Sequence, residues 1–180
     1  MNPALQFIFS RRSIRSFTEQ AVSDELVEDL LQAAMAAPSA KKKDPWHFLV
    51  IRDRQRLRAM ARIQPYGRML RQAPLGILVC GDIELALDQE LSFMLQDLSA
   101  AMENLLLAAN VLGLGACWVG VHPRKERMSG LAELFGLPER IIPVAAVALG
   151  WPAKTAEART RYNPARVHRE EWTETSAGGS

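Results

Sequence analysis

The segment "LSFMLQDLSAAMENLLLAANVL", residues 91–112, is the longest stretch of regular apolar spacing in the chain. Its apolar residues recur every three or four positions, which is typical of a helix. They are Leu91, Leu95, Leu98, Met102, Leu105, Ala109 and Leu112. Residues 106–108 add apolar surface on a second flank, so we expect this helix to be buried nearly all round and to end at Gly113.

Shorter elements surround this helix on both sides. Four short and largely apolar runs predict buried strands, at residues 47–51, 76–80, 116–121 and 141–150. Helices are predicted at residues 3–10, at 25–37 after an N-cap at Ser23, at 54–63, and at 130–135 before Gly136. Because strands and helices do not alternate regularly, the order favours an α+β layered sandwich over a doubly wound fold.

The composition is that of an ordinary globular protein. The chain has 180 residues, of which 48% are hydrophobic and 23% charged, so we expect one domain over residues 1–172. Residues 173–180, "TETSAGGS", are small and polar and predict a flexible tail. No apolar run approaches the ~20 residues of a membrane span. In "MNPALQFIFSRR" the charge follows the apolar residues, the reverse of a secretory signal, so we expect a cytoplasmic protein.

Charge and cysteine content argue against several classes of function. The net charge of +2 is too small for a general nucleic-acid binder, which has a dominant basic field. Cys80 and Cys117 each lie in an apolar run, which predicts two buried thiols and no disulfide framework. The three histidines share no ligand spacing, so no metal site is predicted.

The chain begins and ends with clusters of arginines. In "SRRSIRSF", residues 10–17, Arg11, Arg12 and Arg15 lie among serines, a combination suited to gripping a phosphate. A solvated basic helix end explains the same residues equally well. Arg159 and Arg161 in "RTRYNP" share a face of an extended chain. They could close on the same anion, or they could form surface ion pairs of little energetic value.

Two further stretches are candidate ligand-binding sites. In "APSAKKKDPWHF", residues 37–48, backbone amides freed at a helix end could contact a planar ring or a phosphate, while the lysine run is typical of a solvated turn. In "GLGACWVGVHP", residues 113–123, the glycines follow a helix and open a strand, so neither a Rossmann site nor a P-loop is predicted. With no hydrolytic constellation in the sequence, a cofactor could carry the chemistry.

Four of these stretches, taken in order, resemble motifs of the nitroreductase family of FMN-dependent oxidoreductases. They are "RRSIRSF", "APSAKKKDPWHFLVI", "GLGACWVG" and "RTRYNPARVH", and the resemblance extends in this order over essentially the whole chain. The resemblance implies a three-layer α/β/α sandwich with a central, mostly antiparallel sheet. It also implies an intertwined homodimer with two FMN sites at the subunit interface.

The resemblance also assigns residues to the cofactor. It places the FMN phosphate on Arg11, Arg12, Ser13, Arg15, Arg159 and Arg161. Pro38, Ser39 and Ala40 would approach the isoalloxazine from the partner subunit, and the backbone around Gly120 and Val121 would face flavin N5. Tyr66 and Arg68 are candidates for the pyrimidine edge of the flavin.

Two positions depart from the family pattern. Lys42 stands where the family often has Asn, and Asp44 where it often has Gln. The Asn usually contacts the polar edge of the flavin. Lys42 could still donate there and would favour an anionic reduced flavin, or it could point to solvent.

The activity implied by the resemblance is ping-pong transfer of a hydride from NADH or NADPH through FMN to electron-poor acceptors such as nitroaromatics or quinones. The flavin would carry the chemistry, and no catalytic side chain is expected. The alternative is a flavin-binding carrier or sensor without NAD(P)H turnover. Relatives that dehalogenate or that cleave flavins leave a specialised substrate open.

Overall fold

A four-stranded antiparallel sheet forms the middle of the computed structural model, which describes residues 2–154 and 156–172. The strand order is β1 (Trp46–Ile51), β2 (Leu75–Asp82), β4 (Ile141–Gly150), β3 (Gly115–Gly120). All three strand pairings are antiparallel. β3 therefore lies at one edge of the sheet. The expected tail at residues 173–180 lies outside the described residues.

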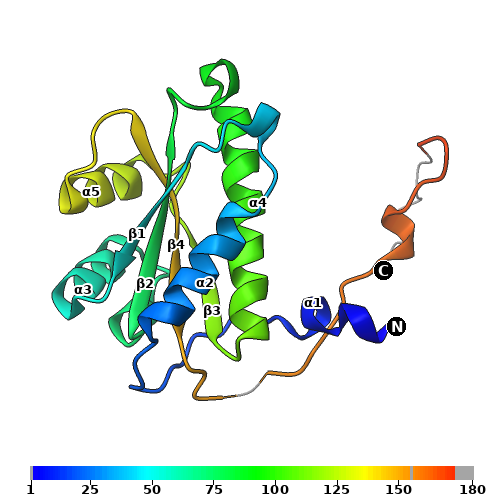
Figure 1. Ribbon diagram of the computed structural model, residues 1–180, viewed down its shortest axis with the longest axis horizontal. Helices are drawn as coiled ribbons and strands as arrows, with labels where there is room; N and C mark the ends of the chain where they lie inside the picture. Colours follow the sequence, from blue (N-terminus) through cyan, green and yellow to red (C-terminus); the bar gives the residue numbers. More distant parts are fainter. Residues whose placement is uncertain (1, 155, 173–180) are drawn as a thin grey trace, which may run out of the picture.

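Helices cover both faces of this sheet (Figure 1). The long α4 (Leu91–Val111) and α2 (Asp24–Met35) pack on one face, and α3 (Arg54–Ile63) and α5 (Lys125–Phe135) pack on the other. The short α1 (Gln6–Ser10) lies beside the C-terminal end of α4. Single 3-10 turns occur at Pro3–Leu5, Ala40–Lys42, Arg68–Arg71, Leu87–Gln89 and Pro164–Arg166. The predicted α+β three-layer sandwich with an antiparallel sheet is confirmed.

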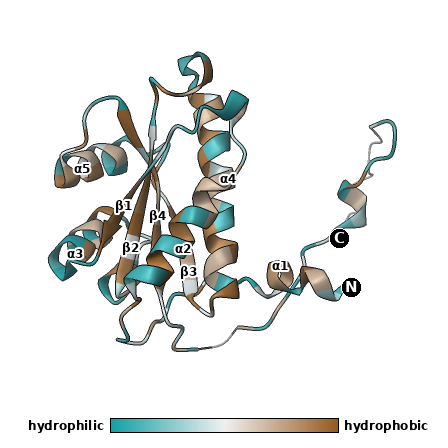
Figure 2. Cartoon of the chain, in the orientation of Figure 1, coloured by the Kyte–Doolittle hydropathy of each residue, from teal (hydrophilic) through white to brown (hydrophobic). Residues whose placement is uncertain are grey.

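The sheet has a hydrophobic core on each side because successive strand residues point to opposite faces. Ile77 belongs to the core under α2 and α4, whereas its neighbour Leu78 belongs to the core under α3 and α5. Every residue of β2 is buried, and the strand is largely hydrophobic up to Cys80 before it ends at the buried Asp82 (Figure 2). The continuous apolar runs in the sequence reflect this burial on both faces.

Most predicted element boundaries are confirmed within a residue or two. α3 and β4 coincide with the predicted ranges, Ser23 caps α2, and Gly113 follows α4 with a positive φ of 75°. α5 begins at Lys125, five residues before the predicted start at Gly130. The first turn of α5 is polar and exposed, so it carries no apolar periodicity that could predict it.

One prediction about burial is wrong for the single chain. α4 is not buried all round, because a polar stripe along it is exposed: Ser92, Gln96, Ser99 and Glu103. Residues 156–172, here called the C-terminal arm, leave the body instead of folding back over it (Figure 1). The arm's side chains of Tyr162 and Trp172 are 72% and 76% exposed.

No helix in the described residues is long and apolar enough to cross a membrane.

Candidate functional site

The N-terminal arginines lie in an extended segment that runs along the sheet edge. Ser13 pairs with Ala116 of β3 in a parallel bridge, and the Ile14 amide donates to the Ala116 carbonyl at 2.9 Å. Because side chains alternate in an extended chain, Arg11, Ser13 and Arg15 share one face. The segment therefore spreads its guanidinium groups along β3.

One end of this segment meets the start of the C-terminal arm. The two segments together line a hollow of about 260 Å³, here called the anion hollow. Its lining residues are Ile8, Arg11, Arg12, Arg159 and Arg161. The Arg12 guanidinium donates to the Glu157 carbonyl, and the Arg159 amide donates to the Phe9 carbonyl at 3.3 Å. Four of the predicted phosphate-binding residues thus lie together, although about 150 residues separate the two pairs in sequence.

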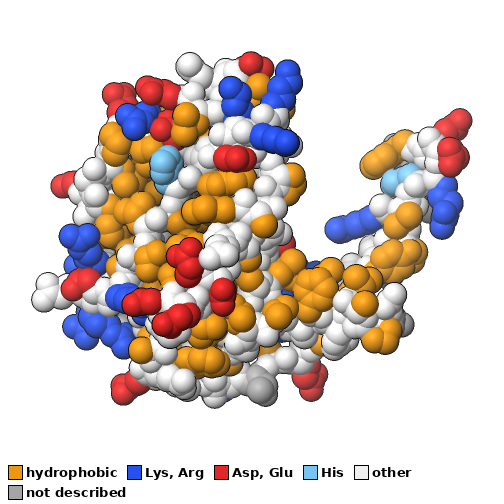
Figure 3. All heavy atoms as spheres, viewed as in Figure 1, with side chains coloured by type: hydrophobic (Ala, Val, Ile, Leu, Met, Phe, Trp, Pro, Cys, Tyr) orange, Lys and Arg blue, Asp and Glu red, His pale blue; other side chains and the backbone are white. Residues whose placement is uncertain are grey.

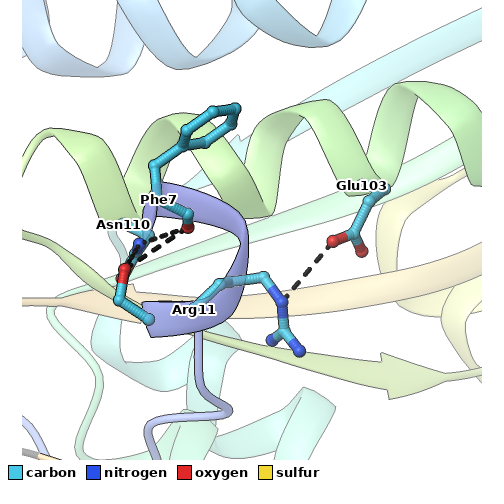
Figure 4. A network of polar contacts seen from close by, with 5 residues as sticks. Phe7, Arg11, Glu103 and Asn110 are labelled. Carbon is cyan, nitrogen blue, oxygen red and sulfur yellow. Dashed lines mark hydrogen bonds and ion pairs between the residues drawn. The ribbon is translucent and has the colours of Figure 1, made fainter. Parts of the chain in front are cut away.

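The anion hollow is electrostatically uncompensated. Within residues 2–154 and 156–172 no carboxylate lines it, and the positive charges of Arg12 and Arg161 lower the pKa of Arg159 below its ordinary value. The Nε of Arg11 lies 3.5 Å from Oε1 of Glu103, but both side chains are partly exposed, so this pair is weak (Figure 4). A bound dianion would relieve the repulsion between the guanidinium groups.

Asn110 of α4 fixes α1 directly before these arginines. Its Nδ2 donates to the Phe7 carbonyl at 2.9 Å and to the Ser10 hydroxyl at 2.8 Å (Figure 4). Sequence reasoning missed Asn110, because a single amide within an apolar helix matches no binding motif.

A second and larger cavity lies farther along the same segment. This cavity of about 760 Å³, here called the β3 pocket, is lined by Arg15, Pro65, Tyr66, Arg68, Met69, Gln72, residues 117–120 and Arg127. Its volume is in the range of small-molecule sites. The structure therefore brings together Arg15, Gly120 and the two candidates for the pyrimidine edge, Tyr66 and Arg68. Arg127 and Gln72 were missed, since neither lies in a recognisable motif.

Gly120 and Val121 have different surroundings. Gly120 is exposed, and a Cβ built on it would meet nothing within 4 Å, so its backbone faces open space in the pocket. Val121 is fully buried, and its amide donates to the Val144 carbonyl at 3.1 Å. Val121 is absent from the pocket wall, which leaves Gly120 as the exposed backbone of the pair.

Cys117 lies in the wall of the β3 pocket beside Arg15. Burial raises the pKa of the Cys117 thiol, and the positive charges of Arg15 and Arg11 offset part of that shift. Cys80 and Cys117 are both buried and unpaired, which confirms the prediction of two buried thiols.

The loop after α2 is held by a buried carboxylate of α4. The Ala40 amide donates to Oδ1 of Asp97 at 2.8 Å. This amide is therefore occupied, whereas the sequence predicted a free amide that could contact a ligand. The Ser39 hydroxyl donates to Asp44, and the Lys42 side chain is exposed. Oδ2 of Asp97 is buried without a hydrogen-bond partner.

A single chain keeps this loop apart from the attachment point of α1. Asp97 holds the loop and Asn110 holds α1, and these two residues are thirteen positions apart on α4. At a rise of 1.5 Å per residue, that spacing is ~20 Å. Residues 38–40 line neither the anion hollow nor the β3 pocket of their own chain.

Comparisons with known proteins agree with this architecture. The sequence model of the nitroreductase family matches residues 8–66 and 64–151. An Archaeoglobus fulgidus protein, provisionally named NADH dehydrogenase/NAD(P)H nitroreductase, is 47% identical over 175 residues, which cover 96% of this chain and 100% of that protein. A crystal structure of a protein with the same provisional name from Parabacteroides distasonis has a TM-score of 0.89 and 35% identity, covering 96% of this chain and 100% of that one.

A third comparison includes a cofactor. The structure of a Desulfovibrio desulfuricans protein, provisionally named a nitroreductase and solved in complex with FMN, has a TM-score of 0.81 and 38% identity. The match covers 96% of this chain and 99% of that chain. The family model spans most of the chain and the relatives are similar over nearly their full lengths; the chain therefore belongs to the nitroreductase family.

Proposed function

We propose that this chain is an FMN-dependent oxidoreductase that passes a hydride from NADH or NADPH to electron-poor acceptors such as nitroaromatics and quinones. The observation that carries the proposal is the pairing of an uncompensated arginine hollow with a pocket of ring-binding size along one extended segment. The FMN complex of the Desulfovibrio desulfuricans relative supports the choice of cofactor.

The residues present fit FMN in charge and in shape. Arg11, Arg12, Arg159 and Arg161 would hold the phosphate in the anion hollow. Ser13 and Arg15 follow the ribityl chain along β3 towards the β3 pocket, which takes the isoalloxazine. Gly120 presents its exposed backbone beside flavin N5, and Val121 anchors the end of the strand through its bond to Val144.

The flavin supplies the redox chemistry when bound: it takes up a hydride from NAD(P)H and delivers it to the acceptor. The chain's own residues bind and orient the reactants. No carboxylate and no histidine lines the β3 pocket within the described residues, so the pocket wall lacks the two kinds of side chain that most often carry general acid or base catalysis. Arg15 places a fixed positive charge beside the ring and favours its reduced, anionic form.

The complete site contains two chains. Pro38, Ser39, Ala40 and Lys42 approach the flavin from a second copy, since in their own chain they line neither the anion hollow nor the β3 pocket, and ~20 Å of α4 separates their loop from the attachment point of α1. Exposed apolar side chains on α1 and α4 support a homodimer: Phe7, Ile8 and Val111 are 41%, 43% and 64% exposed. Apolar side chains gather over the region of α1 in the space-filling view (Figure 3). The C-terminal arm, which leaves the body of its own chain, packs on the partner subunit. Because the arm belongs to the dimer in this way, we assign residues 1–172 to a single domain.

Mixing two defective variants tests the two-chain site. Arg11→Ala damages the phosphate end and Ala40→Tyr obstructs the ring end, so each pure homodimer has two damaged sites. In a heterodimer one site carries both changes and the other carries neither. Refolding an equal mixture should restore about a quarter of the wild-type FMN sites. Half of the dimers are then heterodimers, and one of the two sites in each heterodimer is intact. A mixture that recovers no sites would show that each site belongs to one chain.

The visible absorption spectrum tests the activity itself. The purified protein should be yellow or become so on adding FMN, should bleach anaerobically with NADH or NADPH, and should recover its colour with a nitroaromatic or a quinone. A flavin that NAD(P)H fails to reduce would indicate the carrier or sensor alternative. A protein that retains no yellow flavin after excess FMN has been removed by gel filtration would refute the cofactor assignment.

We also propose a cytoplasmic location, in keeping with a nicotinamide co-substrate and with two unpaired thiols. Cell fractionation followed by immunoblotting tests it.

A further inference from the structure

All ionised side chains that line the β3 pocket carry positive charge. They are Arg15, Arg68 and Arg127, and neither Asp nor Glu is among the lining residues. Within residues 2–154 and 156–172, none of these three arginines forms an ion pair with a carboxylate. The pocket therefore has an excess of positive charge that the protein itself does not neutralise. The proposed function uses only Arg15 of this set, beside the flavin ring.

Arg127 is held in place although it has no carboxylate partner. Its Nη1 donates to the Gly120 carbonyl at 3.2 Å, and its Cζ lies 5.7 Å from the centre of the Tyr66 ring. Its side chain is half-buried, while Tyr66 is 79% exposed at the mouth of the pocket. One hydrogen bond and a cation–π contact fix the guanidinium but leave most of its five N–H donors unused.

We propose that Arg127, together with Arg68 of the same pocket wall, selects electron acceptors that carry a carboxylate or similar anionic substituent. This inference rests on the proposed function, because it assumes that the acceptor ring stacks on a flavin beside Gly120. An acceptor in that position places its ring substituents next to the guanidinium that is bonded to Gly120. The planar guanidinium offers paired donors that match a carboxylate, whereas a neutral substituent gains no such contact.

The reaction with such an acceptor balances with the co-substrate already proposed. Reduction of 4-nitrobenzoate to 4-nitrosobenzoate takes up two electrons and two protons and releases one water. Oxidation of NAD(P)H to NAD(P)⁺ supplies the two electrons and one of the protons, and solvent supplies the other. The carboxylate takes no part in these steps, so its contribution is to binding alone.

A binding experiment without turnover tests the inference directly. Benzoate and benzamide have nearly the same shape and differ in charge, and neither is reduced. We expect benzoate to perturb the absorption of the FMN-loaded protein with a dissociation constant about tenfold lower than that of benzamide, the preference expected for one partly screened charge-assisted hydrogen bond. Arg127→Gln should remove most of this preference, and Arg127→Lys should retain part of it.

Arg124→Gln is the matched control. Arg124 is exposed, lies directly before α5 and is absent from the pocket wall, so its substitution changes the net charge of the protein by the same amount. The preference for benzoate should be unchanged in this variant. A loss of preference as large as that in Arg127→Gln would mean that overall charge, and not the pocket, attracts the anion, and would refute the proposal.

Turnover with the corresponding substrates separates the acceptor from the nicotinamide. Arg127→Gln and Arg68→Gln should each lower the ratio of kcat/KM for 4-nitrobenzoate to that for 4-nitrobenzamide. If the variants leave this ratio unchanged and instead raise KM for NADH or NADPH, the arginines bind the phosphates of the dinucleotide and the proposal is wrong. Equal losses with both acceptors would indicate a structural effect on Gly120 and would also refute it.

Failure of this inference can be told apart from failure of the proposed function. A protein that binds FMN and is reduced by NAD(P)H but treats benzoate and benzamide alike refutes only the acceptor preference. A protein that binds no flavin, or whose flavin NAD(P)H cannot reduce, refutes the proposed function before the acceptor is considered.

Discussion

Replacing Arg11 by Ala should weaken the binding of FMN without a comparable loss of folding stability. A charge-assisted hydrogen bond from a guanidinium to a phosphate contributes ~1.5–3 kcal/mol, which corresponds to a roughly 10- to 150-fold increase in the Kd of FMN. The side chain of Arg11 is 28% exposed, so the lower half of this range is the better expectation. The free energy of unfolding should fall by at most ~1 kcal/mol, since the Arg11–Glu103 pair is partly exposed and 3.5 Å long.

Riboflavin provides the decisive comparison because it lacks only the phosphate. Fluorescence titration of the apoprotein with FMN and with riboflavin gives two dissociation constants for each variant. If Arg11 binds the phosphate, Arg11→Ala should weaken FMN binding and leave riboflavin binding nearly unchanged. Equal weakening for both ligands, or no weakening for either, would contradict the assignment of the anion hollow to the phosphate.

Glu103→Gln is the control for the loss of the ion pair. It removes the same pair as Arg11→Ala but retains the guanidinium. Its affinity for FMN should equal or slightly exceed that of the wild type, because Arg11 then has no competing carboxylate. A Glu103→Gln variant with FMN affinity as weak as that of Arg11→Ala would show that the ion pair, and not a phosphate contact, is responsible.

Three further predictions concern the scaffold. Asn110→Ala removes two hydrogen bonds that hold α1 and should lower the free energy of unfolding by ~1–3 kcal/mol, with faster amide hydrogen exchange in residues 5–10. Leu105→Ala, at a fully buried position of α4, should cost ~2–5 kcal/mol in urea unfolding. Burial raises the pKa of Cys80 from 9.0 to about 12, so above pH 9 the unfolded chain loses a proton that the folded chain keeps. From pH 8 to pH 10 the wild type should therefore lose ~1.4 kcal/mol more stability than Cys80→Ala does.

The fold was predictable because most of its helices and strands have a regular local pattern of apolar residues. The sheet is buried on both faces, so each strand is a largely apolar run, and the predicted bounds of β4 match the observed bounds. The predicted bounds of the amphipathic helix α3 also match. The first turn of α5 was not predictable, since a polar, exposed turn such as that at Lys125 has no pattern that distinguishes it from a loop. Apolar periodicity reports burial, and an exposed helical turn is invisible to it.

The candidate site was predictable only where its residues share a short motif. The arginines at both ends of the chain were predicted as one cluster; the structure brings Arg11, Arg12, Arg159 and Arg161 together in the anion hollow, whereas Arg15 lines the β3 pocket. Arg127 and Asn110 were missed because each acts alone within a helix, and their importance depends on what the tertiary fold places opposite them. The hydrogen-bond partner of Asp97, the Ala40 amide of the loop after α2, was not predicted for the same reason.

The arginines of this protein can be sorted by whether the chain itself satisfies them. Nε of Arg140 lies 2.9 Å from Oδ2 of the buried Asp82, and the hydrogen bond to this carboxylate and its negative charge raise the pKa of Arg140. Nη2 of Arg52 lies 2.7 Å from Oδ1 of Asp24. Such partners identify arginines that brace the fold. Within the described residues, the guanidinium groups of the anion hollow and the β3 pocket lack strong partners of this kind. We therefore infer that external anions neutralise them.

An absent partner is not sufficient by itself to identify a ligand site. Arg58, Arg62 and Arg71 line a hollow of about 390 Å³ and form no ion pair within the described residues, yet nothing else lines that hollow. A ligand there would find charge but no backbone group or apolar wall to orient it, and solvent would screen the attraction. The β3 pocket differs because an exposed glycine backbone, an aromatic ring and unpaired guanidinium groups converge on one cavity. That convergence, more than the number of arginines, is the reason for assigning the chemistry to the β3 pocket.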